Sequence, residues 1–393
     1  MAYKPSEFPA DKLPPTIFNM IEVEIAKRAS NRQKVIGLHV GDANLDLPGN
    51  LKSPIPGEKQ HFGSNLNRYG NTYGEPPLLK LLLLKIRLGN MLPFEDIDSI
   101  QITAGATGAL QAGFSRLLHT GAEILTLSPY WSILRQVADQ AKVNLIEVPF
   151  WDRITGEESF DLTAHFSKFL SPNTEAIYLN TPSNPTGMVL DEKTLHQIGE
   201  FAEAHDLWIF SDEAYEDFIY DKRDHISIGS LPGMTERVIS IFTMSKCFGA
   251  SGLRVGYAVA RPPIIAELNR GVVGGYYEAG RYDQQMAWRG MQQIDKIVAK
   301  FKSDYMKAWD FVRTELKAES MPSIAGFYFF IKVPDSWIKL SPGEKVSRML
   351  DLGVVLSPGE YFGNDYRNWL RLCFTVAPFS DIKRSVELLN GLY

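Results

Sequence analysis

The sequence predicts an α/β fold, with a doubly wound, mostly parallel sheet in a large domain and a smaller α+β domain. The chain has 393 residues, which is more than one hydrophobic core usually holds. Between about residues 99 and 260, short β-branched or aromatic runs alternate with longer helical patterns, which is typical of parallel sheets covered by helices. Beyond about residue 290, one long amphipathic pattern and runs of aromatic residues replace this alternation, which indicates a second domain of another type.

The elements of the large domain follow from hydrophobic periodicity. Helix 191–205 has Leu195, Ile198 and Phe201 on one face, whereas the strands are short apolar runs. In chain order we expect strand 100–103, helix 108–118, strand 123–127, helix 132–141, strand 176–180, helix 191–205, and strands 207–211, 238–243 and 255–260.

The C-terminal part contains an amphipathic helix followed by mixed elements. We expect helix 294–316, strands 326–333, 354–356 and 369–375, and a closing helix over 380–389.

No repeat, low-complexity tract or charge block divides the chain, so the domain boundaries come from element order. Residues 1–50 are expected to form an N-terminal arm and part of the small domain. The large domain is assigned to 51–290 and the C-terminal small domain to 291–393.

Composition excludes several classes of protein. The net charge is −5 and no long basic run occurs, so a nucleic-acid surface is not expected. The apolar run 78–86 contains two lysines and is too short to span a bilayer, and no apolar stretch typical of a secretory signal follows Met1. Cys247 and Cys373 cannot form a disulfide framework, and neither they nor the seven histidines have metal-site spacing. We therefore expect a cytoplasmic protein without a bound metal.

Polar residues follow several predicted strands, where ligands bind in parallel α/β sheets. Asn180, Ser211 and Thr243 each close a strand. After the first of them, Asn184 lies in a proline-rich segment that would hold its amide rigidly, although the segment also fits a simple turn. Asp212 follows a nearly all-apolar strand, where a carboxylate is costly unless donors or a cation meet it, although Asp is also a good helix N-cap.

Two further segments lie at strand ends. Lys246 leaves a buried strand for a glycine-rich stretch, and buried lysines readily form Schiff bases, although surface lysines are common. The residues Gly105-Ala106-Thr107-Gly108 lie between a strand and a helix start, where backbone N–H groups favour a phosphate. By itself this short turn is weak evidence.

Together the four segments supply a lysine, a buried carboxylate, a rigid amide and a phosphate cradle, which is the set that pyridoxal 5'-phosphate (PLP) requires. The chain resembles the class I/II PLP-dependent aminotransferases of fold type I, the family of aspartate aminotransferase. The resemblance runs from about Ile36 to the C-terminus, and its most specific part is Ser245-Lys246 through Gly252-x-Arg254-x-Gly256-Tyr257.

The resemblance implies a role for each matching residue. Lys246 corresponds to the lysine that forms the Schiff base with PLP and moves the α-proton. Asp212 corresponds to the partner of the pyridine nitrogen, and Tyr215 and Asn184 to the two residues that bind the phenolic oxygen. The other cofactor-binding positions are Gly105, Ala106, Thr107, Thr243, Ser245 and Arg254, with Trp131 stacked on the ring.

Other matching residues concern the substrate and the partner subunit. Arg371 corresponds to the arginine that binds the substrate α-carboxylate, with Gly41 and Asn184 beside it. Tyr69 resembles the tyrosine that reaches the phosphate in the other subunit, which implies a homodimer with shared active sites.

The implied activity is transfer of an amino group between an amino acid and a 2-oxo acid. The segment 274–285 departs from the family, because it contains bulky and charged residues instead of small ones. Together with the variant Gly252-Leu253-Arg254, it leaves open an elimination or cyclisation reaction on an amino acid, for example an arginine-like one, as in enzymes of the capreomycidine synthase type. Glu278 and Asp283 could receive a cationic substrate side chain or form a solvated loop, whereas Arg281 is a candidate second arginine for a dicarboxylate.

Overall fold

In the computed structural model, residues 17–41, 66, 68–156 and 160–393 are described. The main sheet has the strand order β2-β8-β7-β6-β5-β3-β4. Strand β8 is antiparallel to both of its neighbours, and all the other pairs are parallel. The strands are β2 (Ile100–Thr103), β3 (Glu123–Ser128), β4 (Asn144–Pro149), β5 (Thr174–Asn180), β6 (Trp208–Asp212), β7 (Val238–Thr243) and β8 (Gly256–Val259). The expected mostly parallel sheet is confirmed.

Helices cover both faces of this sheet, so it is doubly wound. Side chains of α4 (Gly105–Leu117), α5 (Leu134–Ala141) and α10 (Pro262–Tyr276) share one apolar cluster with the sheet. Side chains of α7 (Leu162–Phe166) and α8 (Glu192–Ala204) belong to the cluster on the opposite face. Alternate residues of the central strands β5 and β6 therefore enter different cores, as the two-residue period of a strand requires.

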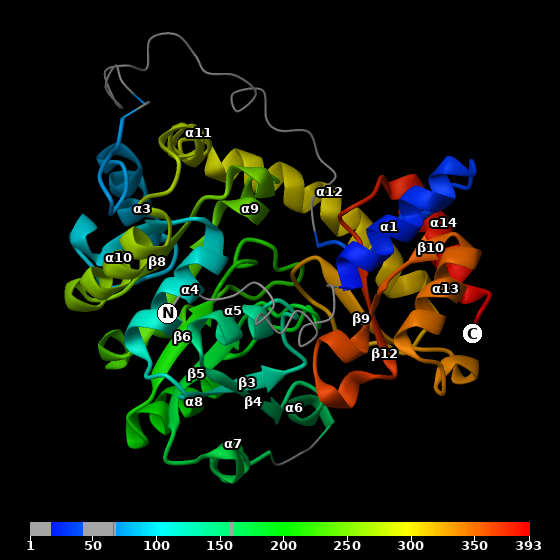
Figure 1. The fold of residues 1–393 in the computed structure, drawn as a ribbon, viewed down its shortest axis with the longest axis horizontal. Helices are drawn as coiled ribbons and strands as arrows, with labels where there is room; N and C mark the ends of the chain where they lie inside the picture. Colours follow the sequence, from blue (N-terminus) through cyan, green and yellow to red (C-terminus); the bar gives the residue numbers. More distant parts are fainter. Residues whose placement is uncertain (1–16, 42–65, 67, 157–159) are drawn as a thin grey trace, which may run out of the picture.

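Most of the C-terminal elements gather at the other end of the molecule, as Figure 1 shows. Strands β11 (Ser357–Pro358), β12 (Trp369–Cys373) and β9 (Tyr328–Lys332) form an antiparallel sheet. Around them lie α1 (Ile17–Ser30), α12 (Ile294–Glu315), α13 (Pro342–Leu352) and α14 (Phe379–Asn390). Strand β1 (Ile36–Gly37) pairs in parallel with β10 (Val354–Val355), which places this N-terminal strand beside the C-terminal part. The division at residues 50 and 290 stays a prediction.

Several elements differ from the sequence prediction. Strand β4 is absent from that prediction, as are α3 (Pro76–Leu88), α6 (Arg153–Gly156), α10, α11 (Arg281–Met291) and α13. Helix α4 begins at Gly105 instead of residue 108, and β6 extends to Asp212. Lys246 lies in a four-residue helix, α9 (Met244–Cys247). Gly105, Ala106 and Thr107, three predicted cofactor-binding residues, therefore form the first turn of a helix.

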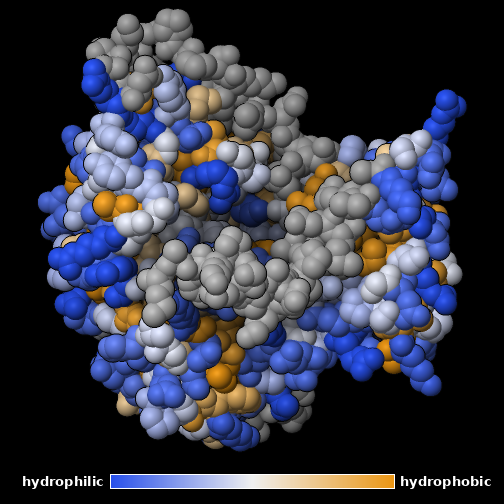
Figure 2. Space-filling model, viewed as in Figure 1, coloured by the Kyte–Doolittle hydropathy of each residue, from blue (hydrophilic) through white to orange (hydrophobic). Residues whose placement is uncertain are grey.

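The surface shown in Figure 2 is largely hydrophilic, with smaller hydrophobic areas between the polar side chains. Over the described ranges, no helix has the length and apolar character that crossing a membrane requires.

Candidate active site

A pocket of about 340 Å³ opens at the carboxyl ends of β5, β6 and β7, facing strands β9 and β12. A pocket of this size holds a small-molecule ligand. Of the residues predicted to bind the cofactor or the substrate α-carboxylate, Gly105 and Tyr69 are not part of its wall. All the others line it: Gly41, Ala106, Thr107, Trp131, Asn184, Asp212, Tyr215, Thr243, Ser245, Lys246, Arg254 and Arg371.

Asp212 is the buried carboxylate at the end of β6, with 5% of its surface exposed. One carboxylate oxygen accepts a hydrogen bond from the Tyr178 hydroxyl at 2.9 Å, and the other accepts the Ala214 N–H at 3.2 Å. Burial raises the pKa of Asp212 to about 6, because desolvation outweighs these two hydrogen bonds. A positively charged ligand group at this carboxylate would offset the free-energy cost of burying its negative charge.

Lys246 projects from α9, directly after β7. Its Nζ donates to the carbonyl oxygen of Gly41 at 2.7 Å, and it lies 5.8 Å from the ring centroid of Tyr215. The hydroxyl of Thr243 caps this short helix by accepting the Ser245 N–H at 3.2 Å, and it donates to the Ser245 hydroxyl at 2.9 Å. The cap fixes the direction in which the lysine leaves the strand.

The start of α4 meets Arg254 on the pocket wall. A Cβ on Gly105, which has a φ of +72°, would lie 2.6 Å from a guanidinium nitrogen of Arg254. A Cβ on Gly256 would lie 2.6 Å from the carbonyl carbon of Gly105 and 2.8 Å from the nitrogen of Ala106. Glycines at both positions therefore let β8, the helix start and a guanidinium converge. Backbone N–H groups at a helix N-terminus, together with arginine, form a suitable site for a phosphate.

Arg371 lies at the opposite end of the pocket, on β12, with 2% of its surface exposed. Its guanidinium donates to Asn184 Oδ1 at 2.9 Å and to the carbonyl oxygen of His39 at 2.6 Å. The Asn184 amide nitrogen lies 3.5 Å from the Tyr215 hydroxyl. Arg371, Asn184 and Tyr215 therefore form a connected row across the pocket.

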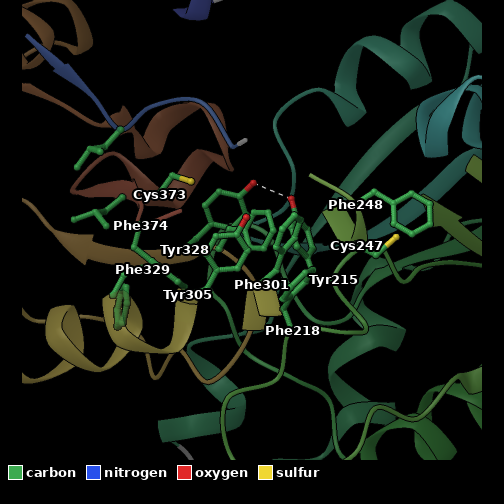
Figure 3. Packing of buried hydrophobic residues seen from close by; sticks show 14 of the residues in the cluster. Tyr215, Phe218, Cys247, Phe248, Phe301, Tyr305, Tyr328, Phe329, Cys373 and Phe374 are labelled. Atoms are coloured by element: carbon green, nitrogen blue, oxygen red, sulfur yellow. Dashed lines mark hydrogen bonds between the residues drawn. The ribbon is translucent and has the colours of Figure 1, made fainter. Parts of the chain in front are cut away.

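Tyr328 is a site residue that the sequence prediction does not contain. Its hydroxyl lies 2.8 Å from that of Tyr215, and Figure 3 shows the two side chains pointing toward one another. The Arg371 guanidinium lies 4.5 Å from the Tyr328 ring centroid, in a cation–π contact. The alternating aromatic residues of 326–333 predict a strand, but this pattern does not indicate that Tyr328 faces a ligand pocket. Other lining residues outside the prediction are Val40, Ile133, Asn180, Ala214 and Ser251.

The remaining predicted residues lie elsewhere. Tyr69 is 78% exposed and packs against Tyr277, with 4.5 Å between ring centroids. Glu278 accepts the Gly70 N–H with both carboxylate oxygens, at 2.9 and 3.0 Å. Arg281 forms a hydrogen-bonded ion pair with Glu75. Neither Glu278, Asp283 nor Arg281 lines the pocket of its own chain, and the contact of this segment with a substrate stays a prediction.

The residues of the pocket fit PLP. The ring nitrogen requires an anion, and Asp212 is a carboxylate buried in the wall. The phosphate requires donors, and the α4 terminus lies beside Arg254, Ser245 and Thr243. The aldehyde requires an amine, and Lys246 lies in the same pocket.

Comparison with known proteins agrees with this chemistry. Residues 33–387 match the family model "Aminotransferase class I and II". The aspartate aminotransferase of Pyrococcus abyssi is 28% identical over 355 residues, which cover 89% of each chain. The aromatic-amino-acid aminotransferase 2 of Thermococcus litoralis is 28% identical over 363 residues, again 89% of each chain. A solved aspartate aminotransferase structure from Thermus thermophilus superimposes with a TM-score of 0.85 at 21% identity, over 98% of both chains.

The chain belongs to the class I and II aminotransferase family. It is a PLP-dependent aminotransferase of fold type I. The relatives named above are all aminotransferases, and the elimination or cyclisation alternative gains no support from them.

Proposed function

We propose that this pocket transfers the amino group of an α-amino acid with an uncharged side chain, with Lys246 as the catalytic base. The observation that carries the proposal is the shared pocket of Lys246, Asp212, Arg254 and Arg371. When bound, PLP supplies the electron sink for bond breaking at the substrate α-carbon. Asp212 would hold the proton on the ring nitrogen, and Trp131 would cover the ring. The residues proposed to bind the phosphate are Gly105, Ala106, Thr107, Thr243, Ser245 and Arg254.

Lys246 is proposed to move the proton. Its Nζ can accept a proton from the α-carbon and return it at a neighbouring atom, which is general acid–base catalysis by one amine. The Tyr215 hydroxyl and the Asn184 amide are 3.5 Å apart, so both can donate to one oxygen of the ligand. Burial raises the pKa of Tyr215 well above its usual range, which supports a neutral hydroxyl as the donor.

Arg371 is proposed to bind the α-carboxylate through its planar fork of donors. The neutral oxygens of Asn184 and His39 already orient the guanidinium at 2.9 and 2.6 Å. The Gly41 backbone would complete the carboxylate site. This arrangement uses only the part that all α-amino acids share.

The other residues of the pocket wall support the proposal that the substrate side chain is uncharged. Arg254 belongs to the phosphate end and Arg371 to the carboxylate end, and the other described wall residues near them include Val40, Ile133 and Tyr328. A dicarboxylate would require a further cation in the pocket, whereas Arg281 is paired with Glu75 outside it.

A substrate panel tests the reaction and the side-chain class together. We expect kcat/KM to be at least tenfold higher for leucine, methionine or phenylalanine than for aspartate or arginine. A single turnover without acceptor should release one 2-oxo acid per site and no ammonia. Ammonia release would indicate elimination, and a preference for aspartate or arginine would reject the side-chain class.

Reduction with borohydride tests the lysine. After reduction, the cofactor mass should be found on the peptide that contains Lys246. Lys246→Ala should lower kcat by several orders of magnitude, because the PLP anchor and the base are removed together. A label on another lysine would refute the assignment.

We also propose a cytoplasmic homodimer in which Tyr69 acts in the site of the partner subunit. The exposed position of Tyr69, outside the pocket of its own chain, supports this role. Two buried cysteines without a disulfide support a reducing location.

A further inference from the structure

The short stretch around Tyr69 is bonded to the segment that joins α10 to α11. Glu278 accepts the Gly70 N–H with both carboxylate oxygens, at 2.9 and 3.0 Å. The Arg281 guanidinium donates to the carbonyl oxygen of Arg68 at 3.3 Å. The residues on both sides of Tyr69 are therefore held by this segment, whereas the Tyr69 side chain is 78% exposed.

The ion pair of Arg281 with Glu75 lies directly against the backbone of the same stretch. Its two side chains are only 13% and 7% exposed. A Cβ on Gly70 would lie 2.5 Å from Glu75 Oε1 and 2.8 Å from Arg281 Nε, so only a glycine backbone fits over the pair. The Glu75 N–H donates to the side-chain oxygen of Gln284 at 2.8 Å, and the Gln284 amide donates to the Ala279 carbonyl at 2.8 Å. The stretch and the segment therefore form one closely packed unit.

The segment meets this stretch through a strained backbone conformation. Tyr277 has a φ of +71° and a ψ of −59°, and the Glu278 N–H donates to the Tyr276 carbonyl at 2.9 Å. These values define the γ-turn with a positive φ, which is rare and unfavourable for a residue with a side chain. Such a conformation persists only where its surroundings stabilise it. The Tyr277 ring packs on the Tyr69 ring and Glu278 binds Gly70, so the γ-turn presents both side chains to the same stretch.

We propose that Glu278, Arg281 and Tyr277 are positioning residues that fix the direction in which Tyr69 projects. The proposal rests on the proposed role of Tyr69 in the site of the partner subunit and adds three residues that act through Tyr69. It also gives a physical reason for the bulky and charged residues of segment 274–285, since their side chains hold the stretch 68–70 in place.

Hydrogen exchange at Gly70 tests the positioning contact without turnover. In the cofactor-free protein, Glu278→Ala should speed exchange of the Gly70 amide by at least about tenfold, as expected for loss of a hydrogen bond to a charged group. Glu278→Gln keeps an acceptor oxygen and should retain most of the protection. Unchanged exchange in Glu278→Ala would overturn the proposal.

PLP affinity tests whether the contact acts through Tyr69. Glu278→Ala should weaken PLP binding by up to the factor that Tyr69→Phe causes, and it should add little in a chain that already carries Tyr69→Phe. Equal losses in both backgrounds, or a loss in Tyr69→Phe alone, would show that Glu278 does not act through Tyr69. If Tyr69→Phe leaves PLP affinity unchanged, the proposed role of Tyr69 is wrong, and exchange at Gly70 still decides whether Glu278 holds the stretch.

Substrate kinetics separate this role from direct recognition of a cationic side chain. Glu278→Gln keeps the hydrogen-bond acceptor and removes the charge, so the ratio of KM for arginine to KM for leucine should stay near the wild-type value. A selective rise of KM for arginine in this variant, with unchanged PLP affinity, would contradict the proposal and favour a substrate contact.

Glu267→Ala is the matched control. Glu267 lies on the neighbouring helix α10 and accepts hydrogen bonds from Arg116 at 2.7 Å and Arg270 at 2.6 Å, so this variant also removes a paired carboxylate. Exchange at Gly70 and PLP affinity should stay near the wild-type values, and changes equal to those of Glu278→Ala would refute a specific role. If Glu278→Ala does not fold, Gly70→Ala decides, because its Cβ must move the stretch off the ion pair and unchanged PLP affinity there would reject the proposal.

Discussion

The buried carboxylate of Asp212 contributes to the pH dependence of stability in the cofactor-free protein. Its pKa in the folded state is about 6, compared with an ordinary value of 3.8, and burial is the largest cause. The folded protein therefore binds this proton more tightly than the unfolded chain does, so ionisation destabilises the fold. The loss develops between about pH 4 and pH 6 and is complete above that range.

Asp212→Asn is expected to stabilise the cofactor-free protein at pH 7.5 by up to about 3 kcal/mol, the equivalent of a two-unit shift. The asparagine removes the buried charge and keeps one acceptor oxygen. Reversible urea unfolding at pH 4.5 and 7.5 measures the effect. The advantage of the variant should grow with pH, and a pH-independent difference would contradict burial of the ionised carboxylate as its cause.

The contact between β8 and the start of α4 depends on the absence of a side chain at Gly256. In Gly256→Ala, the new methyl would lie 2.6 to 2.8 Å from backbone atoms of Gly105, Ala106 and Phe242. The helix start must then move away from Arg254, and we expect PLP affinity to fall by roughly tenfold or more.

Gly252→Ala is the control for this substitution. Gly252 lies in the segment that leads into β8, just before Gly256, yet a Cβ on Gly252 would have no other atom within 4 Å. PLP affinity, measured by titration of the cofactor-free protein, should stay near the wild-type value in this variant. Equal losses in both variants would show that general damage to the segment is responsible.

The sequence is most informative where strands end. Asn180, Asp212 and Thr243 lie at strand ends in the structure, because a short apolar run followed by a polar residue leaves little freedom in placement. Strand β4 escapes prediction because its residues, Asn144–Pro149, mix polar and apolar side chains without a strong alternation. Helix α10 is not predicted because its last two turns contain three glycines, which are poor helix formers.

The far wall of the pocket is less predictable. Strand β12 pairs with β9, so that Arg371 lies opposite Phe330 and Tyr328 opposite Cys373. Arg371 can be placed by resemblance, whereas the position of Tyr328 depends on how this small sheet packs against residues far away in the sequence, such as Tyr215, which lies 113 positions earlier. No local pattern contains that information.

At the scale of the whole molecule, one subunit leaves Tyr69 outside its own pocket. If Tyr69 serves the partner, a hybrid of a Tyr69→Phe chain and a Lys246→Ala chain contains one complete site. We expect such hybrids, isolated with two different tags, to recover about half of the wild-type activity per dimer, since one of two sites is intact.

The two parent homodimers are the controls, and both should be strongly impaired. If Tyr69 instead serves its own chain, no hybrid site is complete, and activity should stay at half that of the Tyr69→Phe homodimer. A protein that sediments as a monomer with full activity would refute the shared site.

The reactivity of the two cysteines can report transient opening of the structure near the pocket. Cys247 follows Lys246 on α9, and Cys373 lies on β12 two residues after Arg371, so the two thiols lie on either side of the pocket residues Tyr215 and Tyr328 (Figure 3). Both are buried, and burial raises the pKa of the Cys247 thiol, so each should react with a thiol reagent only during transient opening. With only two cysteines in the chain, each adduct can be assigned by mass. Equal reaction rates would indicate that both sides of the pocket open in one cooperative event. A faster rate at Cys373 would indicate that the sheet β11-β12-β9 opens separately while α9, which contains Lys246, stays packed.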